Sequence, residues 1–242
     1  MDYNNELNFV TSMTRDRELS MSQAFPVLMR KVYVWMALAL AITGITAFGV
    51  ANSPGIITAI YSNQIIFWGL MIAELALVFA ISGAINRLSL TTATMLFVLY
   101  SVINGVVMSS IFLVYAMTSI ASVFFITAGT FAVMAFIGYT TKTDLTSMGK
   151  ILMMAIIGLI IASIVNVFFV KSTGFDLIIS YVGVLIFVGL TAYDSQKIKQ
   201  MLEMAPDASE ASQKLALVGA LSLYLDFINL FIYLLRILGK RE

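Results

Sequence analysis

Three carboxylic acids lie inside long apolar stretches of this sequence. Glu74 lies midway along "LMIAELALVF", Asp226 midway along "SLYLDFINLF", and Asp194 near the end of the apolar run that leads into "GLTAYDSQKIK". An aspartate at the centre of a membrane helix costs about 2.5 to 3.5 kcal/mol on insertion scales, so such groups face protein or water rather than lipid. The three acids are therefore the first candidates for proton or cation chemistry.

The residue types that are missing narrow this chemistry. The 242 residues include no cysteine and no histidine. Zinc sites of the usual kind, histidine-ligated haem, and nucleophiles that depend on a thiol or a histidine base are therefore excluded. Any proton chemistry has to come from the carboxylates, and we expect no bound cofactor.

The elements that carry these acids are predicted to be membrane-spanning helices. Hydrophobic residues make up 60% of the sequence, charged residues only 11%, and the mean hydropathy is +0.97, which is typical of a membrane protein. The apolar runs are continuous rather than alternating, and each is close to the roughly 20 residues that span a bilayer core as a helix. The sequence therefore predicts an all-α membrane protein, a bundle of seven transmembrane helices. The predicted stretches are 32–51, 64–85, 92–115, 119–139, 151–170, 175–196 and 215–238.

The seventh stretch carries a polar seam on an otherwise apolar helix. At about 100° per residue, its small and polar residues fall within roughly 80° of one another. A helix that is apolar on nearly all sides, with one polar seam, fits the centre of a bundle. The seam consists of Gly219, Ser222, Asp226, Asn229 and Tyr233.

The remaining segments are too short for a separate soluble domain. The first 30 residues are polar and of mixed charge, and they contain no apolar core of a cleavable signal peptide. We predict a flexible cytoplasmic tail over residues 1–30 and a transmembrane domain over residues 31–242. The lipid bilayer is the expected environment, and no nucleic-acid partner is expected.

The orientation follows from the uneven distribution of lysine and arginine. Ten of the fourteen fall in the tail and in the second, fourth and sixth connections, and the other four are Lys171, Arg236, Lys240 and Arg241. Because positive charge collects on the cytoplasmic side, we predict a cytoplasmic N-terminus and a C-terminus outside.

Four stretches resemble a known family. They are "MLFVLYSVINGVVMSSIFLVY" (95–115), "SIASVFFITAGTF" (119–131), "FVGLTAYDSQKIK" (187–199) and "LSLYLDFINLFIYLLRILG" (221–239). Together they closely resemble the bacterial branch of the Bax inhibitor family of transmembrane proteins, over nearly the whole chain after the tail. The resemblance implies a protein of the inner (plasma) membrane, with the last helix central and wrapped by the other six.

The resemblance also implies a site. Asp194 and Asp226 match the carboxyl pair that acts as the pH sensor of the family, and their oxygens are candidate calcium contacts. Arg87 is the nearest match to a basic residue proposed to latch the acid of the sixth helix, and Glu74 and Asn229 are further candidates along the pathway. Members are described as proton-sensitive calcium leak channels and, in some bacteria, as partners of a membrane-bound AAA protease.

Helix arithmetic leaves the contact between the two aspartates open. At 1.5 Å per residue, Asp194 lies about 5 to 8 Å inside the lysines at 197 and 199, whereas Asp226 lies about 18 Å beyond Lys214. The two carboxyl groups meet only if Lys214 stands well outside the bilayer or the helices are staggered. If they do meet, they share a proton, because two carboxylates in a site of low dielectric do not comfortably ionise together.

Two other functions compete with a proton-sensitive calcium leak channel. One is a non-conducting regulator whose tail, residues 1–30, is presented to a membrane-bound AAA protease. The other is an intramembrane aspartyl protease, since "AYDS" resembles the YD motif of presenilin-like enzymes. Those enzymes carry GxGD at the second acid, where this sequence has "LYLD" at 223–226, so we expect no enzyme.

Overall fold

The structure, a computed structural model, describes residues 3–241. This part of the chain consists mainly of helices joined by short loops. Within these residues no strand forms beyond an isolated bridge between Tyr115 and Arg241, so the all-α prediction is confirmed. The helices are α1 (Tyr3–Ala51), α2 (Pro54–Tyr61), α3 (Gln64–Ala84), α4 (Leu90–Met108), α5 (Ile111–Val114), α6 (Met117–Thr140), α7 (Thr146–Val165), α8 (Thr173–Glu203) and α9 (Glu210–Leu238). A 3₁₀ turn (Ile85–Arg87) follows α3 and a π-helical turn (Asn166–Val170) follows α7.

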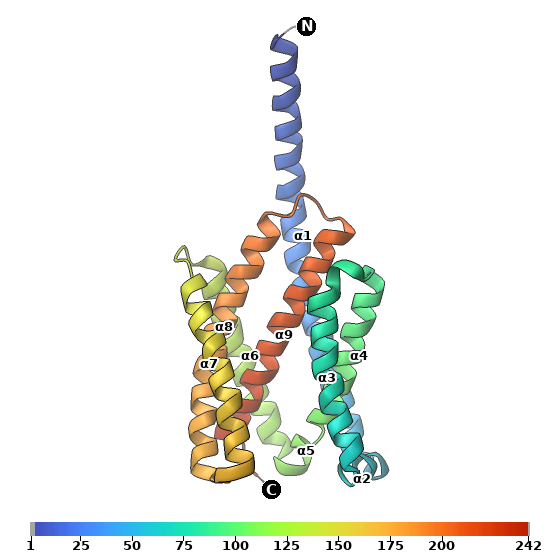
Figure 1. The fold of residues 1–242 in the computed structure, drawn as a ribbon, viewed down its shortest axis with the longest axis vertical. Coiled ribbons are helices and arrows are strands. Elements are labelled where there is room, and N and C mark those ends of the chain that lie inside the picture. The colour runs from blue at the N-terminus through green and yellow to red at the C-terminus, as the bar shows by residue number, and fades with distance from the viewer. Residues whose placement is uncertain (1–2, 242) are drawn as a thin grey trace.

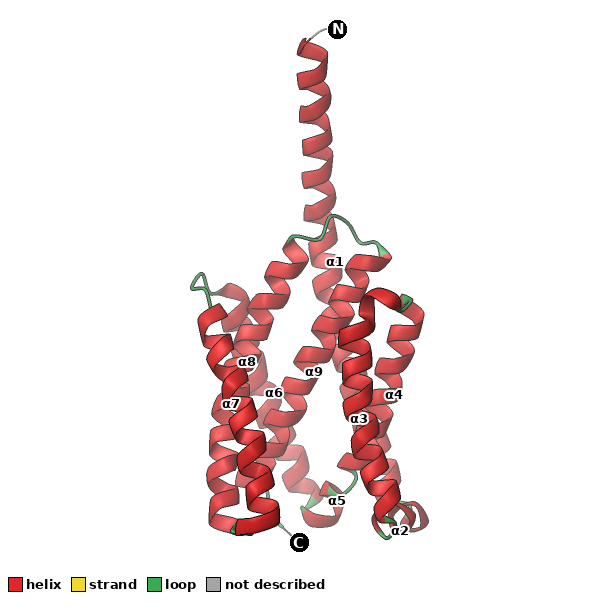
Figure 2. Ribbon diagram, in the orientation of Figure 1, coloured by secondary structure: helices red, strands yellow, loops and turns green. Residues whose placement is uncertain are grey.

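Seven helical segments in the described chain are long and apolar enough to cross a bilayer. Each corresponds to one predicted stretch, so the prediction of seven spans is confirmed. Figure 2 shows that the loops gather at the two ends of the bundle and that helices fill the length between them. The spans are Ser20–Ala51, Gln64–Arg87, Leu90–Val114, Met117–Thr140, Thr146–Val170, Thr173–Glu203 and Glu210–Leu238.

The first helix begins much earlier than the sequence suggested. α1 runs from Tyr3 through Pro26 to Ala51, so no helix boundary separates residues 3–30 from the first span. Residues 3–30 contain no glycine, and their Glu, Leu, Met and Arg residues favour helix although much of this segment is too polar for a bilayer. Figure 1 shows the first part of α1 projecting beyond the bundle. The flexibility of the tail stays a prediction.

The last helix is the most buried span. α9 buries 67% of its most apolar window, whereas α3 buries only 6%. It packs against α1, α4, α6 and α8, and in Figure 1 it crosses the middle of the view between α3 and α7. The predicted wrapping of this helix by all six others stays a prediction.

Two close contacts between helix backbones depend on glycine. A Cβ atom on Gly138 of α6 would overlap the carbonyl group of Ala192 on α8, and one on Gly105 of α4 would lie 2.7 Å from the Thr43 carbonyl oxygen on α1. Small residues let membrane helices approach in this way.

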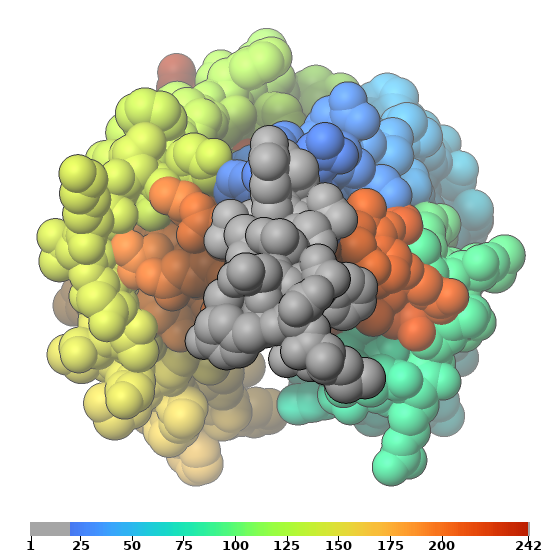
Figure 3. Space-filling view, turned by 90° about the horizontal axis from the view of Figure 1, so that it is seen from above, coloured from blue at the N-terminus to red at the C-terminus, as the bar shows by residue number. Residues whose placement is uncertain are grey.

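α3 and α7 form the flanks of the bundle. The main partner of α3 is α4, and the main partner of α7 is α8. Seen along the long axis, the outline of the molecule is notched between α7 and the segment that joins α3 to α4 (Figure 3). The cavity described next is lined by both flanking helices.

Candidate proton and ion site

A cavity of about 400 Å³ contains both aspartates that the sequence singled out. Its walls come from α3, α7, α8 and α9 and are mainly leucine, isoleucine and other apolar side chains. Its polar lining consists of Asp194, Ser222, Asp226, Asn229 and Tyr233. Such a cavity, apolar with a few converging polar groups, is the usual form of a binding site in a helix bundle.

Asp226 is the most deeply placed acid of this cavity. Its side chain is 4% exposed, and its Oδ2 atom has no hydrogen-bond partner among the described residues. Buried polar atoms in native proteins are nearly always hydrogen-bonded, because an unpartnered one costs about 1 to 3 kcal/mol. An ionised carboxylate in this position would be still more costly.

Asp194 lies on α8 at the same cavity and is only partly buried. The charges of Asp194 and Asp226 act on one another, and Lys197, one turn further along α8, acts on Asp194. No hydrogen bond joins the two carboxyl groups in the part of the chain that is described. The structure therefore brings the two acids into one cavity as near neighbours, which helix arithmetic alone left open.

The polar seam predicted on the last helix faces this cavity along most of its length. Ser222, Asp226, Asn229 and Tyr233 all line it. The Asn229 amide nitrogen donates to the Leu225 carbonyl of its own helix at 2.8 Å, which leaves the amide oxygen as an acceptor. Gly219 lies apart from this group, because it faces Ile198 where α9 crosses α8.

Glu74 does not line the cavity, although its neighbour Leu75 does. The Glu74 carboxyl group lies 2.8 Å from the side-chain amide of Asn104 on α4, within hydrogen-bond distance. The sequence singled out Glu74 but gave no reason to join it to Asn104.

Arg87 lies at the end of the 3₁₀ turn that follows α3, and it is exposed. It forms no ion pair with any residue whose side chain is described. Its role as a latch for Asp194 stays a prediction.

The acids do not form a cluster of the kind that holds a resident metal ion. No group of three or more Asp, Glu, His or Cys side chains is close enough to do so among the described residues. Calcium takes six to eight oxygen ligands. The cavity offers two carboxyl groups, the Ser222 hydroxyl and the Asn229 amide oxygen, so a calcium ion here would keep part of its water shell.

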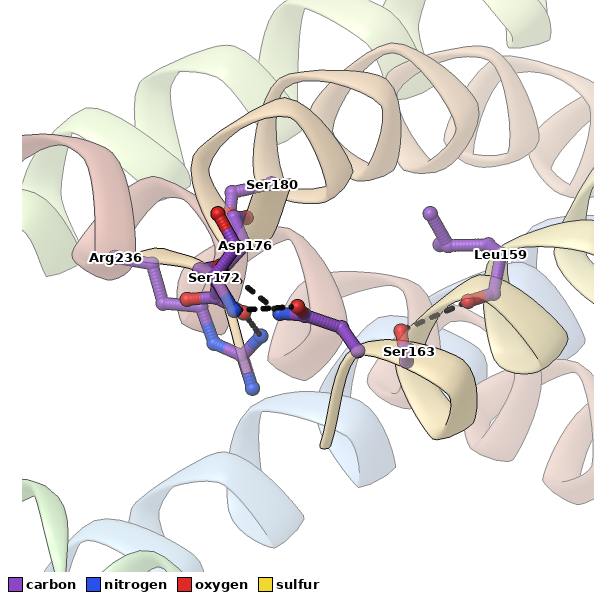
Figure 4. Close-up of polar contacts among 7 residues, drawn as sticks. Leu159, Ser163, Ser172, Asp176, Ser180 and Arg236 are labelled. Carbon is purple, nitrogen blue, oxygen red and sulfur yellow. Dashed lines mark hydrogen bonds and ion pairs between the residues drawn. The ribbon is translucent and has the colours of Figure 1, made fainter. Parts of the chain in front are cut away.

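A set of polar contacts that the sequence did not reveal connects the π-helical turn after α7, the start of α8 and the end of α9, at the end of the bundle away from the projecting part of α1. Arg236 Nη1 lies 3.3 Å from Asp176 Oδ1, and the guanidinium also lies 5.6 Å from the centre of the Tyr233 ring. The Asn166 side chain bonds to both the backbone N–H and the carbonyl of Ser172. Figure 4 shows Asp176 and Arg236 facing one another beside Ser172. The sequence did carry a signal, since an acid that begins one helix and a base that ends the next meet when the helices are antiparallel.

Comparison with known proteins identifies relatives along the whole bundle. The profile of the family described as "Inhibitor of apoptosis-promoting Bax1" matches residues 26–242. The chain is 48% identical over 215 residues to the inner membrane protein YbhL of Escherichia coli K12, which covers 88% of this chain and 92% of that one. It is 50% identical over 212 residues to a protein of Borreliella burgdorferi, and the match covers 88% of this chain and 91% of that protein. It is 39% identical over 187 residues to a membrane protein of Streptococcus pyogenes serotype M6, with 77% and 80% covered.

Proposed function

The chain belongs to the Bax inhibitor family of integral membrane proteins, and on that premise we propose that it is a proton-sensitive, calcium-permeable leak channel. The observation that carries the proposal is the cavity with two acidic side chains, one of them a buried carboxyl group with an unpartnered oxygen. We place the protein in an inner (plasma) membrane, like its Escherichia coli relative, with the N-terminus in the cytoplasm.

The chemistry of the pair supports a proton switch. Two neighbouring carboxyl groups in a cavity with apolar walls disfavour double ionisation, so Asp194 and Asp226 share one proton. Loss of this proton places charge beside the unpartnered Asp226 oxygen, where solvation by protein is poor. A rearrangement of α8 against α9 that admits water or a cation relieves this cost.

The same oxygens favour calcium as the permeant ion. Calcium is a hard cation and binds carboxylate, hydroxyl and amide oxygens, all of which line the cavity. Because the set is too small to replace the full hydration shell, the ion binds weakly enough to leave, as conduction requires.

The test is calcium entry into proteoliposomes that contain the purified protein and a calcium dye, across about pH 5.5 to 8.5. We expect a protein-dependent flux whose pH response is lost in Asp226→Asn. The matched control is Asp176→Asn, which removes an acid of the same bundle from the Arg236 ion pair, outside the cavity. Flux no greater than in empty liposomes at every pH contradicts the channel.

A second candidate function is that of a non-conducting partner of a membrane-bound AAA protease. One observation favours it: α1 extends from the first span as a continuous helix that projects beyond the bundle, where a cytoplasmic partner can reach it. Removal of residues 2–19 is then expected to abolish the effect on the protease while any ion flux is unchanged. Equal protease activity with and without these residues contradicts this role.

A further inference from the structure

A chain of four short polar contacts crosses the bundle from α3 to α1. The Glu74 carboxyl group lies 2.8 Å from the Asn104 side-chain amide, which lies 2.9 Å from the Tyr224 hydroxyl. The Tyr224 hydroxyl lies 2.7 Å from the Thr43 hydroxyl, which lies 2.9 Å from the Ser101 carbonyl oxygen. The chain thus links α3, α4, α9 and α1.

The inner part of this chain is sealed from solvent. Tyr224 is fully buried, Thr43 is 4% exposed and Asn104 is 7% exposed, so each depends on the others for hydrogen bonds. Each of the four contacts therefore needs one donor hydrogen, supplied by one of its two groups. The donor hydrogens available in the chain can be compared with the four that are needed.

With Glu74 ionised, the chain is one hydrogen short. The carboxylate can only accept, so Asn104 directs its NH₂ group at Glu74 and its oxygen at Tyr224, and Tyr224 donates to Asn104. Thr43 then has one hydrogen for two neighbours, the Tyr224 oxygen and the Ser101 carbonyl. One of the four contacts has to remain without a hydrogen.

With Glu74 protonated, every contact is satisfied. The Asn104 amide is then rotated so that its oxygen and its NH₂ group exchange places, two positions that are nearly indistinguishable in a structure. The carboxyl O–H of Glu74 donates to the Asn104 oxygen, and the Asn104 NH₂ group donates to Tyr224. Tyr224 then donates to Thr43, and Thr43 donates to the Ser101 carbonyl. All four distances are consistent with this single direction of donation.

We propose that Glu74 is a second proton-binding site of this protein, separate from the aspartate pair, and that it carries a proton while the chain to Ser101 is complete. Loss of this proton reverses the Asn104 amide and breaks one contact of the chain. The protonation of Glu74 would control how firmly α3, the least buried span, packs against the rest of the bundle.

The electrostatic surroundings agree with a neutral Glu74. The titratable groups on which a Glu74 charge acts are Tyr100 of α4 and Tyr224 of α9, and neither of them supplies a positive charge to stabilise it. Among the described residues no lysine or arginine forms an ion pair with it. Because Leu75 lines the cavity of the aspartate pair, the two proton sites share the wall formed by α3.

The first test detects the proton directly. Infrared spectra of the Asp194→Asn, Asp226→Asn protein at neutral pH are compared with spectra of the same protein carrying Glu74→Gln as well. We expect the C=O stretch of a protonated carboxyl group to be present in the first and absent from the second. A spectrum without this band at neutral pH, with carboxylate bands lost on substitution instead, overturns the proposal.

The second test needs only single substitutions in the wild-type protein and does not require the Asp194→Asn, Asp226→Asn double variant. Glu74→Gln keeps the direction of donation, because its NH₂ group donates to Asn104 as the protonated acid does. If folded Glu74 holds a proton that the unfolded chain has released, raising the pH from about 6 to 9 lowers the unfolding temperature of the wild type. We expect this decline to be smaller in Glu74→Gln, and Glu74→Ala to unfold at a lower temperature than Glu74→Gln at pH 6. Equal slopes in wild type and Glu74→Gln contradict the proposal.

The proton on Glu74 stands apart from ion conduction. Absence of calcium flux would end the channel proposal and leave the infrared band in place. Absence of the band would end this inference and leave the flux experiment unaffected.

Discussion

The two most informative regions of this protein both contain an acid inside the bilayer, and they differ in what surrounds it. Glu74 is joined to Asn104 and, through it, to a chain of partners on three other helices. Asp226 is more deeply buried, and its Oδ2 atom has no partner in the described chain. The difference indicates that the first acid fastens helices together, whereas the second stands in a cavity where a proton or cation can act on it.

The largest expected effect comes from breaking the partnered chain at its middle. Asn104→Leu leaves Glu74 without its hydrogen-bond partner and leaves Tyr224 with Thr43 alone, and an orphaned buried group costs about 1 to 3 kcal/mol. We expect a loss of at least this size in the free energy of unfolding, measured by denaturant titration in lipid or detergent. The matched control is Asn229→Leu, since that amide bonds only to its own helix. Similar losses in the two variants would show that the chain does not stabilise the bundle.

The unpartnered acid is expected to behave in the opposite way. Asp226→Leu replaces a buried carboxyl group by an apolar side chain of similar volume and removes an unsatisfied oxygen. We expect the free energy of unfolding to stay the same or to rise by up to about 1 to 3 kcal/mol. A loss as large as that of Asn104→Leu would mean that Asp226 is a structural group like Glu74.

A smaller effect is expected at the exposed ion pair of Asp176 and Arg236. Both side chains are 38% exposed, and pairs of this kind contribute about 0 to 1 kcal/mol. A double-mutant cycle with Asp176→Asn and Arg236→Gln should give a coupling free energy within this range that falls as salt is added. A larger coupling free energy, or one that does not change with salt, would mean that this ion pair is shielded from solvent as the buried acids are.

The smallest effect is expected at acids outside the membrane. The hydroxyl group and then the backbone N–H of Ser209 hydrogen-bond to Asp207, which lowers the pKa of Asp207 below its usual value. A group with a lowered pKa stabilises the fold above its unfolded pKa and loses this contribution as the pH falls through the folded pKa. The unfolding temperature of the wild type should therefore exceed that of Asp207→Ala by a small amount. This difference should have its full size at neutral pH and should become smaller in acid. A difference that grows in acid would contradict this sign.

Much of the architecture could be predicted from the sequence, because hydropathy reports directly which segments enter a bilayer. The seven spans follow from hydropathy, and the polar seam of α9 follows from the helical period applied to one of them. The start of α1 could not be predicted in the same way, since residues 3–31 are polar enough for water and yet favour helix. Hydropathy has no information on helices that continue outside the membrane.

The partners of the acids could not be predicted, because they depend on how helices pack. Asp194 and Asp226 were expected to form a pair only through a family resemblance, and the structure brings them to one cavity without a hydrogen bond between them. The Glu74 chain involves Thr43 and Tyr224, which are unremarkable in the sequence. Their importance comes from burial and distance, neither of which a single sequence contains.

The most direct test of the account is whether Asp194 and Asp226 act as one proton site on an ion path. We would measure the pH profile of calcium entry into proteoliposomes for Asp194→Asn, Asp226→Asn and the double variant. Because a shared proton belongs to the pair rather than to either residue, each single substitution should abolish the pH response and the double should add nothing further. Single variants that each retain part of the response, with effects that add in the double variant, would contradict the shared site.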